Sequence, residues 1–190
     1  MKKRKIIFQY NAPFTLTFAL ISLIALILGW LTDGATTTKF FCVYRSSLTD
    51  PLTYLRFFTH TLGHASLSHY TGNILLLLVL GPGLEERYGS RSIFFATLIT
   101  ALVSGLVQWI FFPSVALLGA SGVVFMMIIM ASLGGARGDG IPLTLIFVFL
   151  FYVGEEVYDG IFVSDNISQL THIVGGICGA VLGMSLRRRS

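Results

Sequence analysis

Long apolar segments separated by short polar stretches dominate this chain. A helix needs about 20 apolar residues to cross a hydrocarbon core of about 30 Å, and six segments reach or approach that length. They lie at about 13–31, 69–84, 92–112, 120–135, 141–155 and 167–186. The fifth is the least regular, because its apolar run ends before Glu155 and Glu156, so a re-entrant helix or one lining a wet cavity also fits it. The pattern predicts a single all-α membrane domain over residues 1–190 with six transmembrane helices.

The connection between the first two spans, about 32–68, is too long for a tight turn and too polar to cross a bilayer. Its aromatic residues suit a segment that lies in the interface with rings in the headgroup layer: Phe40, Phe41, Tyr44, Tyr54, Phe57 and Phe58. An ordinary surface loop with aromatic anchors is the alternative. We predict a long interfacial loop between the first two helices.

Composition agrees with a membrane location. Apolar residues make up 54% of the chain and charged residues 12%, whereas a soluble domain carries about a quarter charged residues. The net charge of +4 does not indicate nucleic-acid binding, because the basic residues lie in loops and tails.

The run 13–31 is longer than the apolar part of a secretory signal and lacks a small-x-small cleavage site after it, so we predict a retained anchor. Cys42 and Cys178 lie in different settings and imply no disulfide framework.

The basic residues predict the orientation. If the N-terminus is cytoplasmic, ten of the thirteen Lys and Arg residues fall on the cytoplasmic side: Lys2, Lys3, Arg4, Lys5, Arg87, Arg91, Arg137, Arg187, Arg188 and Arg189. The positive-inside rule therefore predicts a multi-pass protein of the plasma or inner membrane with both termini in the cytoplasm.

Four polar residues within or at the ends of these spans stand out: His69, Asn73, Ser121 and His172. Polar groups at membrane depth are costly and so indicate function. Counted to the first cytoplasmic charge on each helix, His69 and Ser121 lie 16 residues away and His172 lies 15 residues away, a rise of ~24 Å. Asn73 follows His69 by four residues and shares its helical face. A nucleophile, a base and extra donors thus share one level in the outer part of the bilayer, although each residue alone is more often a packing or interfacial residue.

Glycines recur at every fourth position of the sixth span, on the stripe that holds His172: Gly175, Gly179 and Gly183. Small residues at this spacing let two helix backbones approach closely in lipid. Gly119 and Gly122 flank Ser121 on the fourth span, the expected partner. Their close approach is expected to bring the His172 imidazole to the Ser121 hydroxyl.

Four motifs in chain order resemble those of the rhomboid intramembrane serine proteases. The histidine-rich stretch 60–73 leads into the second span, and 81–89 is similar to the family's Gly-x-x-x-Glu-x-x-x-Gly turn. The Gly-Ala-Ser-Gly sequence at 119–122 resembles the nucleophile motif, and 172–175 resembles the base motif. Each motif is weak alone, but their combination over about 55–183 is specific.

The resemblance implies a rhomboid-like bundle in which Ser121 is the nucleophile and His172 the general base. It implies that His69, Asn73 and the Ser121 backbone form the oxyanion hole. Structural roles are implied for Arg56 in the loop and for Glu85 near the cytoplasmic end of the second helix.

The remaining residues expected to shape or gate the site lie on the fourth and sixth spans: Gly119, Gly122, Phe125, Gly175 and Gly179. His60 and His64 resemble structural loop residues. Two positions depart from the family's pattern, since Leu55 stands in place of a loop Trp and Phe125 in place of a Tyr stacked on the base. We expect neither change to abolish activity.

These residues predict an intramembrane serine endopeptidase that cleaves transmembrane helices near their outer end. No carboxylate lies at matching depth on the second, fourth and sixth spans, so a Ser-His dyad is expected rather than a triad. The substrate helix must unwind to present its carbonyl, and the resemblance adds a small residue before the cut. The fifth span, with Gly154, is a candidate lateral gate. The expected partners are the lipid bilayer and transmembrane substrates, with no cofactor, no metal and no nucleic acid.

Two other classes of protein share some of these features. A catalytically inactive rhomboid-like protein would bind membrane helices without cutting them, but such relatives lack the Ser or the His, and both are present here. A metal transporter or metalloprotease would use the four histidines, yet the chain has no His-Glu-x-x-His pattern. Sensitivity to chelators separates this last class from a serine enzyme.

Overall fold

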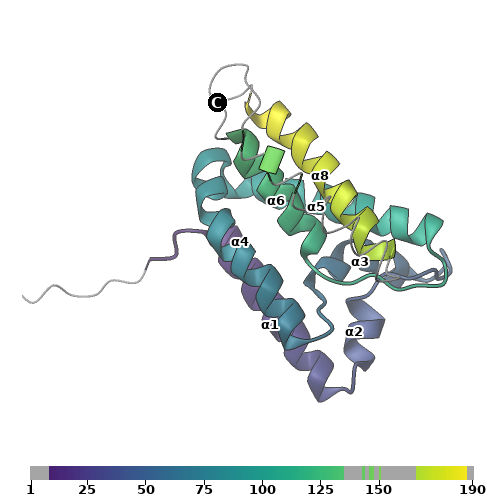
Figure 1. Ribbon diagram of the computed structural model, residues 1–190. Coiled ribbons are helices and arrows are strands. Elements are labelled where there is room, and N and C mark those ends of the chain that lie inside the picture. The colour runs from purple at the N-terminus through teal and green to yellow at the C-terminus, as the bar shows by residue number, and fades with distance from the viewer. Residues whose placement is uncertain (1–8, 135–142, 144–145, 148–149, 151–165, 188–190) are drawn as a thin grey trace, which may run out of the picture.

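The computed structural model describes residues 9–134, 143, 146, 147, 150 and 166–187. Its regular elements are all helical (Figure 1): α1 Pro13–Leu31, α2 Ala35–Phe40, α3 Pro51–Thr59, the 3₁₀ turn η1 His60–Leu62, α4 Leu67–Tyr88, α5 Ser90–Phe111, α6 Ser121–Gly134 and α8 Asn166–Arg187. Within these described residues, β-type pairing is limited to an isolated antiparallel bridge between Val43 and Leu117. The prediction of an all-α protein is confirmed for this part of the chain.

Three helices, α1, α4 and α5, are long and apolar enough to cross a membrane, and α6 and the described part of α8 are shorter apolar helices. The predicted fifth span, 141–155, lies outside the described residues apart from Leu143, Ile146, Phe147 and Leu150. The total of six spans therefore stays a prediction.

The second long helix extends beyond its predicted end. α4 includes Pro82, as the predicted span did, and continues past residue 84 to Tyr88, where the motif 81–89 had indicated a turn. Proline removes one backbone hydrogen bond from a helix, but contacts of α4 with α1 favour the continued helix. Gly81 packs directly against Thr15, and the Glu85 carboxylate accepts from the backbone N–H groups of Phe14 and Thr15 at 3.0 and 2.8 Å.

The Glu85 carboxylate thus satisfies N–H groups at the start of α1 that have no partner within that helix. It also accepts from the Thr15 hydroxyl at 2.6 Å. Farther along the same pair of helices, the Tyr70 hydroxyl donates to the Ala19 carbonyl at 3.1 Å. These contacts show that α1 and α4 run antiparallel, side by side, as Figure 1 shows.

α6 is buried on all sides. Every residue from Gly122 to Met130 is buried, which is the environment expected of a helix that is apolar all round. Two contacts show that α4 and α6 run parallel. His69 near the start of α4 packs against Gly119 just before α6, and Tyr88 at the end of α4 packs against Gly134 at the end of α6. The helix that begins with Ser121 therefore lies at the centre of the described bundle.

The connecting segment 32–66 is folded against the bundle rather than lying wholly at its surface. Phe57 is 4% exposed and packs edge-on against Trp109 with ring centroids 6.5 Å apart. The expectation that all the aromatic rings of this segment lie in the headgroup layer is therefore wrong for Phe57, because Gly105 on α5 lets the α3 backbone come close. Tyr54 and Phe58 remain exposed.

Candidate active site

Ser121 is the first residue of α6. The first turn begins with a bond from the Val124 N–H to the Ala120 carbonyl at 2.9 Å. The N–H of Ser121 is one of the helix-start groups that the helix itself leaves without a partner. A reacting oxygen beside Ser121 would therefore meet a donor at the positive end of the helix.

Gly119 joins this helix start to α4. Its φ of +127° lies in a region that side chains rarely adopt, and a Cβ there would come within 2.8 Å of the His69 ring. Its N–H donates to the His60 carbonyl at 2.9 Å. The φ angle and the nearby ring both require glycine at this position. The His69 imidazole therefore packs against Gly119, which is two residues before Ser121 in the chain.

The packing of α8 on α6 depends on glycine. A Cβ at Gly175 would overlap the Gly122 carbonyl oxygen, and one at Gly179 would lie 2.5 Å from the Met126 carbonyl oxygen. Such contacts between backbones are the close approach expected of a small-residue stripe in lipid. Gly183 continues the same register beside Met130, so α6 and α8 run parallel.

The pairing of Gly175 with Gly122 places His172 level with Gly119, which is two residues before Ser121 and so about 3 Å from its level. The His172 and Phe125 rings lie 5.9 Å apart at 43°. Phe125 follows Ser121 by four residues and so shares its side of α6. His69, Ser121 and His172 are thereby brought to neighbouring levels by three separate helices.

The first turn of α4 is set by a cap. The Ser66 hydroxyl accepts from the His69 N–H at 3.1 Å, an arrangement typical of a helix N-cap. Asn73, one turn later, is buried, and its amide donates to the His69 carbonyl at 2.9 Å. An amide carries two N–H groups, so this bond uses one of them.

His64 lies behind His69, on the loop side. Its ring meets the rings of His69 and Tyr70 edge-on, at 5.0 and 5.5 Å. Burial, with a smaller contribution from the charge of His69, lowers the pKa of His64 to about 4. His64 is therefore a neutral, ring-shaped packing partner for His69 at physiological pH.

His60 is fully buried at the start of η1. Its Nδ1 bonds the Arg56 carbonyl at 3.1 Å and its Nε2 the Ser104 hydroxyl of α5 at 3.3 Å. Burial lowers the pKa of His60 to about 4, despite two backbone hydrogen bonds that act in the opposite direction. The neutral ring joins the connecting segment to α5, while the His60 carbonyl holds Gly119.

Arg56 is buried in the connecting segment with its partners around it. Its Nε donates to the Lys39 carbonyl at 2.9 Å, and its Nη1 lies 3.3 Å from both the Ser46 hydroxyl and the Asp50 carboxylate. Its guanidinium also stacks over Tyr44 at 4.7 Å. The neighbouring Leu55 is 44% exposed.

Two contacts that hold the segment before Ser121 were not predicted. Val43 and Leu117 exchange backbone hydrogen bonds of 2.9 Å, which ties the connecting segment to this approach. The buried Gln108 amide of α5 donates to the Val115 carbonyl at 2.8 Å. Gln108 is an amide inside an apolar span, so its cost at membrane depth was a usable signal, whereas the bridge has no signal in the sequence.

The arrangement offers a hydroxyl, two imidazoles and a helix-start N–H near one another. Among the described residues, no group of three or more His, Cys, Asp or Glu side chains could hold a metal ion. Over the same residues, α6 and α8 carry no Asp or Glu, and the acidic residues of α4 lie in its last turn. Chemically, this set suits attack by a hydroxyl with an imidazole as base.

Comparison with known proteins agrees with the motifs. The family described as Rhomboid domain matches residues 51–189. The chain is 31% identical over 159 residues to Rhomboid-related protein 2 of Mus musculus, and the match covers 73% of this chain and 53% of that protein. The chain thus spans about half the length of this relative. The family match, the helical membrane bundle and the ordered motifs together show that this chain belongs to the rhomboid family.

Proposed function

We propose that this protein is an intramembrane serine endopeptidase with Ser121 as nucleophile and His172 as general base. The observation that carries the proposal is the glycine-dependent approach of α6 and α8, which leaves the His172 ring 5.9 Å from that of Phe125, one helical turn after Ser121. A serine hydroxyl needs an adjacent base to attack at neutral pH. Here the base belongs to the neighbouring helix.

The base is held without a carboxylate. In a Ser-His-Asp triad, the acid orients the imidazole. In the proposed dyad, Phe125 and the glycine-packed backbone of α6 take over that orienting role, since Gly176 also packs directly against the Phe125 ring. Phe125, which stands in place of the expected Tyr, therefore keeps the aromatic ring that packs against His172 and Gly176.

Negative charge that develops on the substrate carbonyl would be stabilised by the Ser121 N–H, His69 and the second Asn73 N–H. Donors aimed at such an oxyanion are each worth about 10²–10³ in rate. His69 supports this role through its contact with Gly119. His172 would then protonate the leaving amine, and water would hydrolyse the acyl-enzyme.

The substrate class follows from the membrane setting. A peptide carbonyl within a helix is occupied by hydrogen bonds, so the proposed substrate is a transmembrane helix that unwinds near its outer end, with a small residue before the cut. The proposed topology has six spans with both termini in the cytoplasm, and the segment 141–155 is the proposed lateral gate. The lipid bilayer and such substrates are the proposed partners.

The test is cleavage of a tagged single-span substrate in proteoliposomes by the native chain and by Ser121→Ala and His172→Ala, with and without chelator. We expect cleavage to fall to background in both variants and to ignore the chelator. Ser132→Ala, at a buried serine of the same helix, is the matched control and should retain cleavage.

Unchanged cleavage by Ser121→Ala would overturn the proposal. A native chain that captures the substrate helix without cutting it would instead favour a helix-binding member of the family. Loss of cleavage with chelator alone would indicate a metal enzyme.

A further inference from the structure

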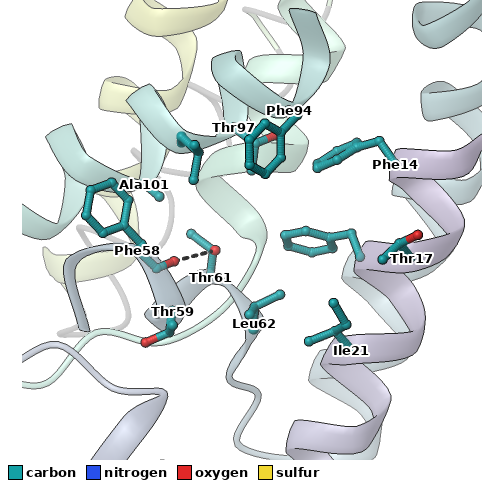
Figure 2. Close-up of a pocket in the computed structure, with 12 residues that line it drawn as sticks. Phe14, Thr17, Ile21, Phe58, Thr59, Thr61, Leu62, Phe94, Thr97 and Ala101 are labelled. Atoms are coloured by element: carbon teal, nitrogen blue, oxygen red, sulfur yellow. Dashed lines mark hydrogen bonds between the residues drawn. The ribbon is translucent and has the colours of Figure 1, made fainter. Parts of the chain in front are cut away.

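A cavity of about 260 Å³ lies between α1, α5 and η1. In Figure 2, Phe14 reaches in from α1 and Phe94 from α5, with Thr61 and Leu62 on the side of the connecting segment. None of Ser121, His172 and His69 lines it. The cavity is therefore separate from the candidate active site.

The walls of the cavity are apolar and one side is open. Of the residues that line it, Ile21, Phe58 and Phe94 are 43%, 36% and 45% exposed, and α1 and α5 are both apolar enough to cross a membrane. Apolar cavities exclude water and accept apolar ligands. In a bilayer, the open side of the cavity faces the acyl chains of lipids.

The cavity is elongated along the axes of α1 and α5, as a lipid acyl chain lying beside these helices would be. On α1 it extends from Phe14 to Ile21 and on α5 from Phe94 to Ala101, so it runs along the first turns of two helices for about 10 Å. The rings of Phe14 and Phe94, in the first turns of α1 and α5, lie 6.2 Å apart, so both helices start at the same surface of the bundle. Thr61 and Leu62 of η1 also line the cavity, whose lining on α1 and α5 ends at Ile21 and Ala101, near the middle of each helix.

A positive charge lies at the surface end of the cavity. Arg91 is exposed and precedes Phe94 by three residues, on the same side of α5. Lipid phosphates lie at the level where such helices enter the membrane, and arginines there attract anionic headgroups. A phosphate at Arg91 would leave its acyl chain directed into the cavity.

We propose that the cavity holds one acyl chain of a phospholipid from the leaflet in which α1 and α5 begin, with its phosphate at Arg91. The lipid chain packs beneath η1, the element whose His60 carbonyl holds Gly119. The lipid therefore supports the base of the connecting segment. This assignment does not depend on the proposed protease activity.

The test uses the full chain in phosphatidylethanolamine–phosphatidylglycerol vesicles doped with a phosphatidylglycerol that carries a diazirine near the end of one acyl chain. After irradiation, adducts are mapped by peptide mass spectrometry. We expect adducts on Thr61 and Leu62 in the native chain and their loss in Ala101→Phe, whose ring fills the cavity. Ile99→Phe, on the same helix but outside the lining, is the matched control and should keep them.

A second variant guards against misfolding of Ala101→Phe. Thr97→Leu also narrows the cavity, and it removes a buried hydroxyl that has no hydrogen-bond partner in the described part of the chain, so it sacrifices no bond. In Thr97→Leu, the lipid adducts on Thr61 and Leu62 should be fewer than in the native chain. In Arg91→Gln, the same adducts should also decrease when phosphatidylglycerol is the probe. Absence of these adducts in the native chain, or equal labelling of native and cavity-filled chains, would overturn the proposal.

Discussion

The α6–α8 interface and the connecting segment 32–66 flank the same serine and are built by different means. At the interface, glycines bring backbones into contact, and a single Cβ at Gly175 would overlap the Gly122 carbonyl. In the connecting segment, buried polar side chains such as Arg56 and His60 bind backbone carbonyls. The first region is sensitive to added volume and the second to lost hydrogen bonds. Substitutions of the two kinds should therefore have different signatures.

The largest effect is expected from Gly175→Ala. The added methyl group forces α8 away from α6, so we expect cleavage to fall by about 10²-fold or more, because a displacement of about 1 Å at reacting groups has that effect. The free energy of unfolding should fall by about 1–3 kcal/mol, the usual cost of overpacking. Cleavage assays and thermal unfolding in detergent measure the two quantities.

Gly183→Ala is the control for this interface. Its Cβ would first meet the end of the Leu133 side chain at 3.2 Å, which can rotate away. We expect less than about 1 kcal/mol of destabilisation and near-native cleavage. A loss as large as that of Gly175→Ala would show that the stripe acts by overall helix packing and not by its contact beside Ser121.

The next effect is expected from Arg56→Gln. The variant leaves the Lys39 carbonyl without its charged donor in a buried place, so we expect about 1–3 kcal/mol of destabilisation. Arg45→Gln is the control, since Arg45 donates to the Trp109 carbonyl at 2.8 Å but is exposed, and it should cost less than about 1 kcal/mol. Equal effects in a thermal unfolding assay would contradict the distinction between buried and exposed arginines.

At neutral pH the smallest effects are expected at the two buried histidines, whose contribution to stability appears as a dependence on pH. Both folded-state pKa values are about 4, below the ordinary 6.5, so the unfolded chain binds more protons between these values. Stability should be constant above pH 6.5 and fall with decreasing pH toward 4, by at most about 1.4 kcal/mol per pH unit for each histidine. Unfolding temperatures measured from pH 7.5 to 4 test this sign.

His64→Phe sharpens this test. Phenylalanine keeps the ring contacts with His69 and Tyr70 and loses the 3.2 Å bond between His64 Nδ1 and the Leu62 carbonyl. His64 Nε2 has no hydrogen-bond partner among the described residues, so the change at neutral pH should be about 1 kcal/mol. His60→Phe loses the bonds to Arg56 and Ser104 and should cost about 1–2 kcal/mol. Each variant should show a shallower slope between pH 6.5 and 4, and an unchanged slope in both would place the titrating groups elsewhere.

The sequence predicts most of the interface and little of the connecting segment. The glycine stripe predicted that the helices of Ser121 and His172 pack together, and the number of residues to the cytoplasmic charges predicted that His69, Ser121 and His172 lie at similar depths. Both predictions were possible because spacing along a helix determines the face and the level of a residue. The catalytic roles of these residues stay predictions.

The contacts of the connecting segment depend on residues far apart in the chain. Val43 pairs with Leu117 through backbone groups that any residue carries, so no side-chain pattern announces the bridge. The last turn of α4, beyond the predicted end at about 84, was also missed, because the tertiary contacts of Gly81 and Glu85 with α1 outweigh the local preference for a turn.

The central claim is that His172 activates Ser121. Its most direct test is covalent labelling with a fluorophosphonate, which reacts with activated serines, followed by mass spectrometry of the modified residue. The dyad predicts an adduct on Ser121 in the native chain that is lost in His172→Ala and retained in Ser132→Ala. A native chain that cleaves substrate without labelling at Ser121, or undiminished labelling in His172→Ala, would contradict it.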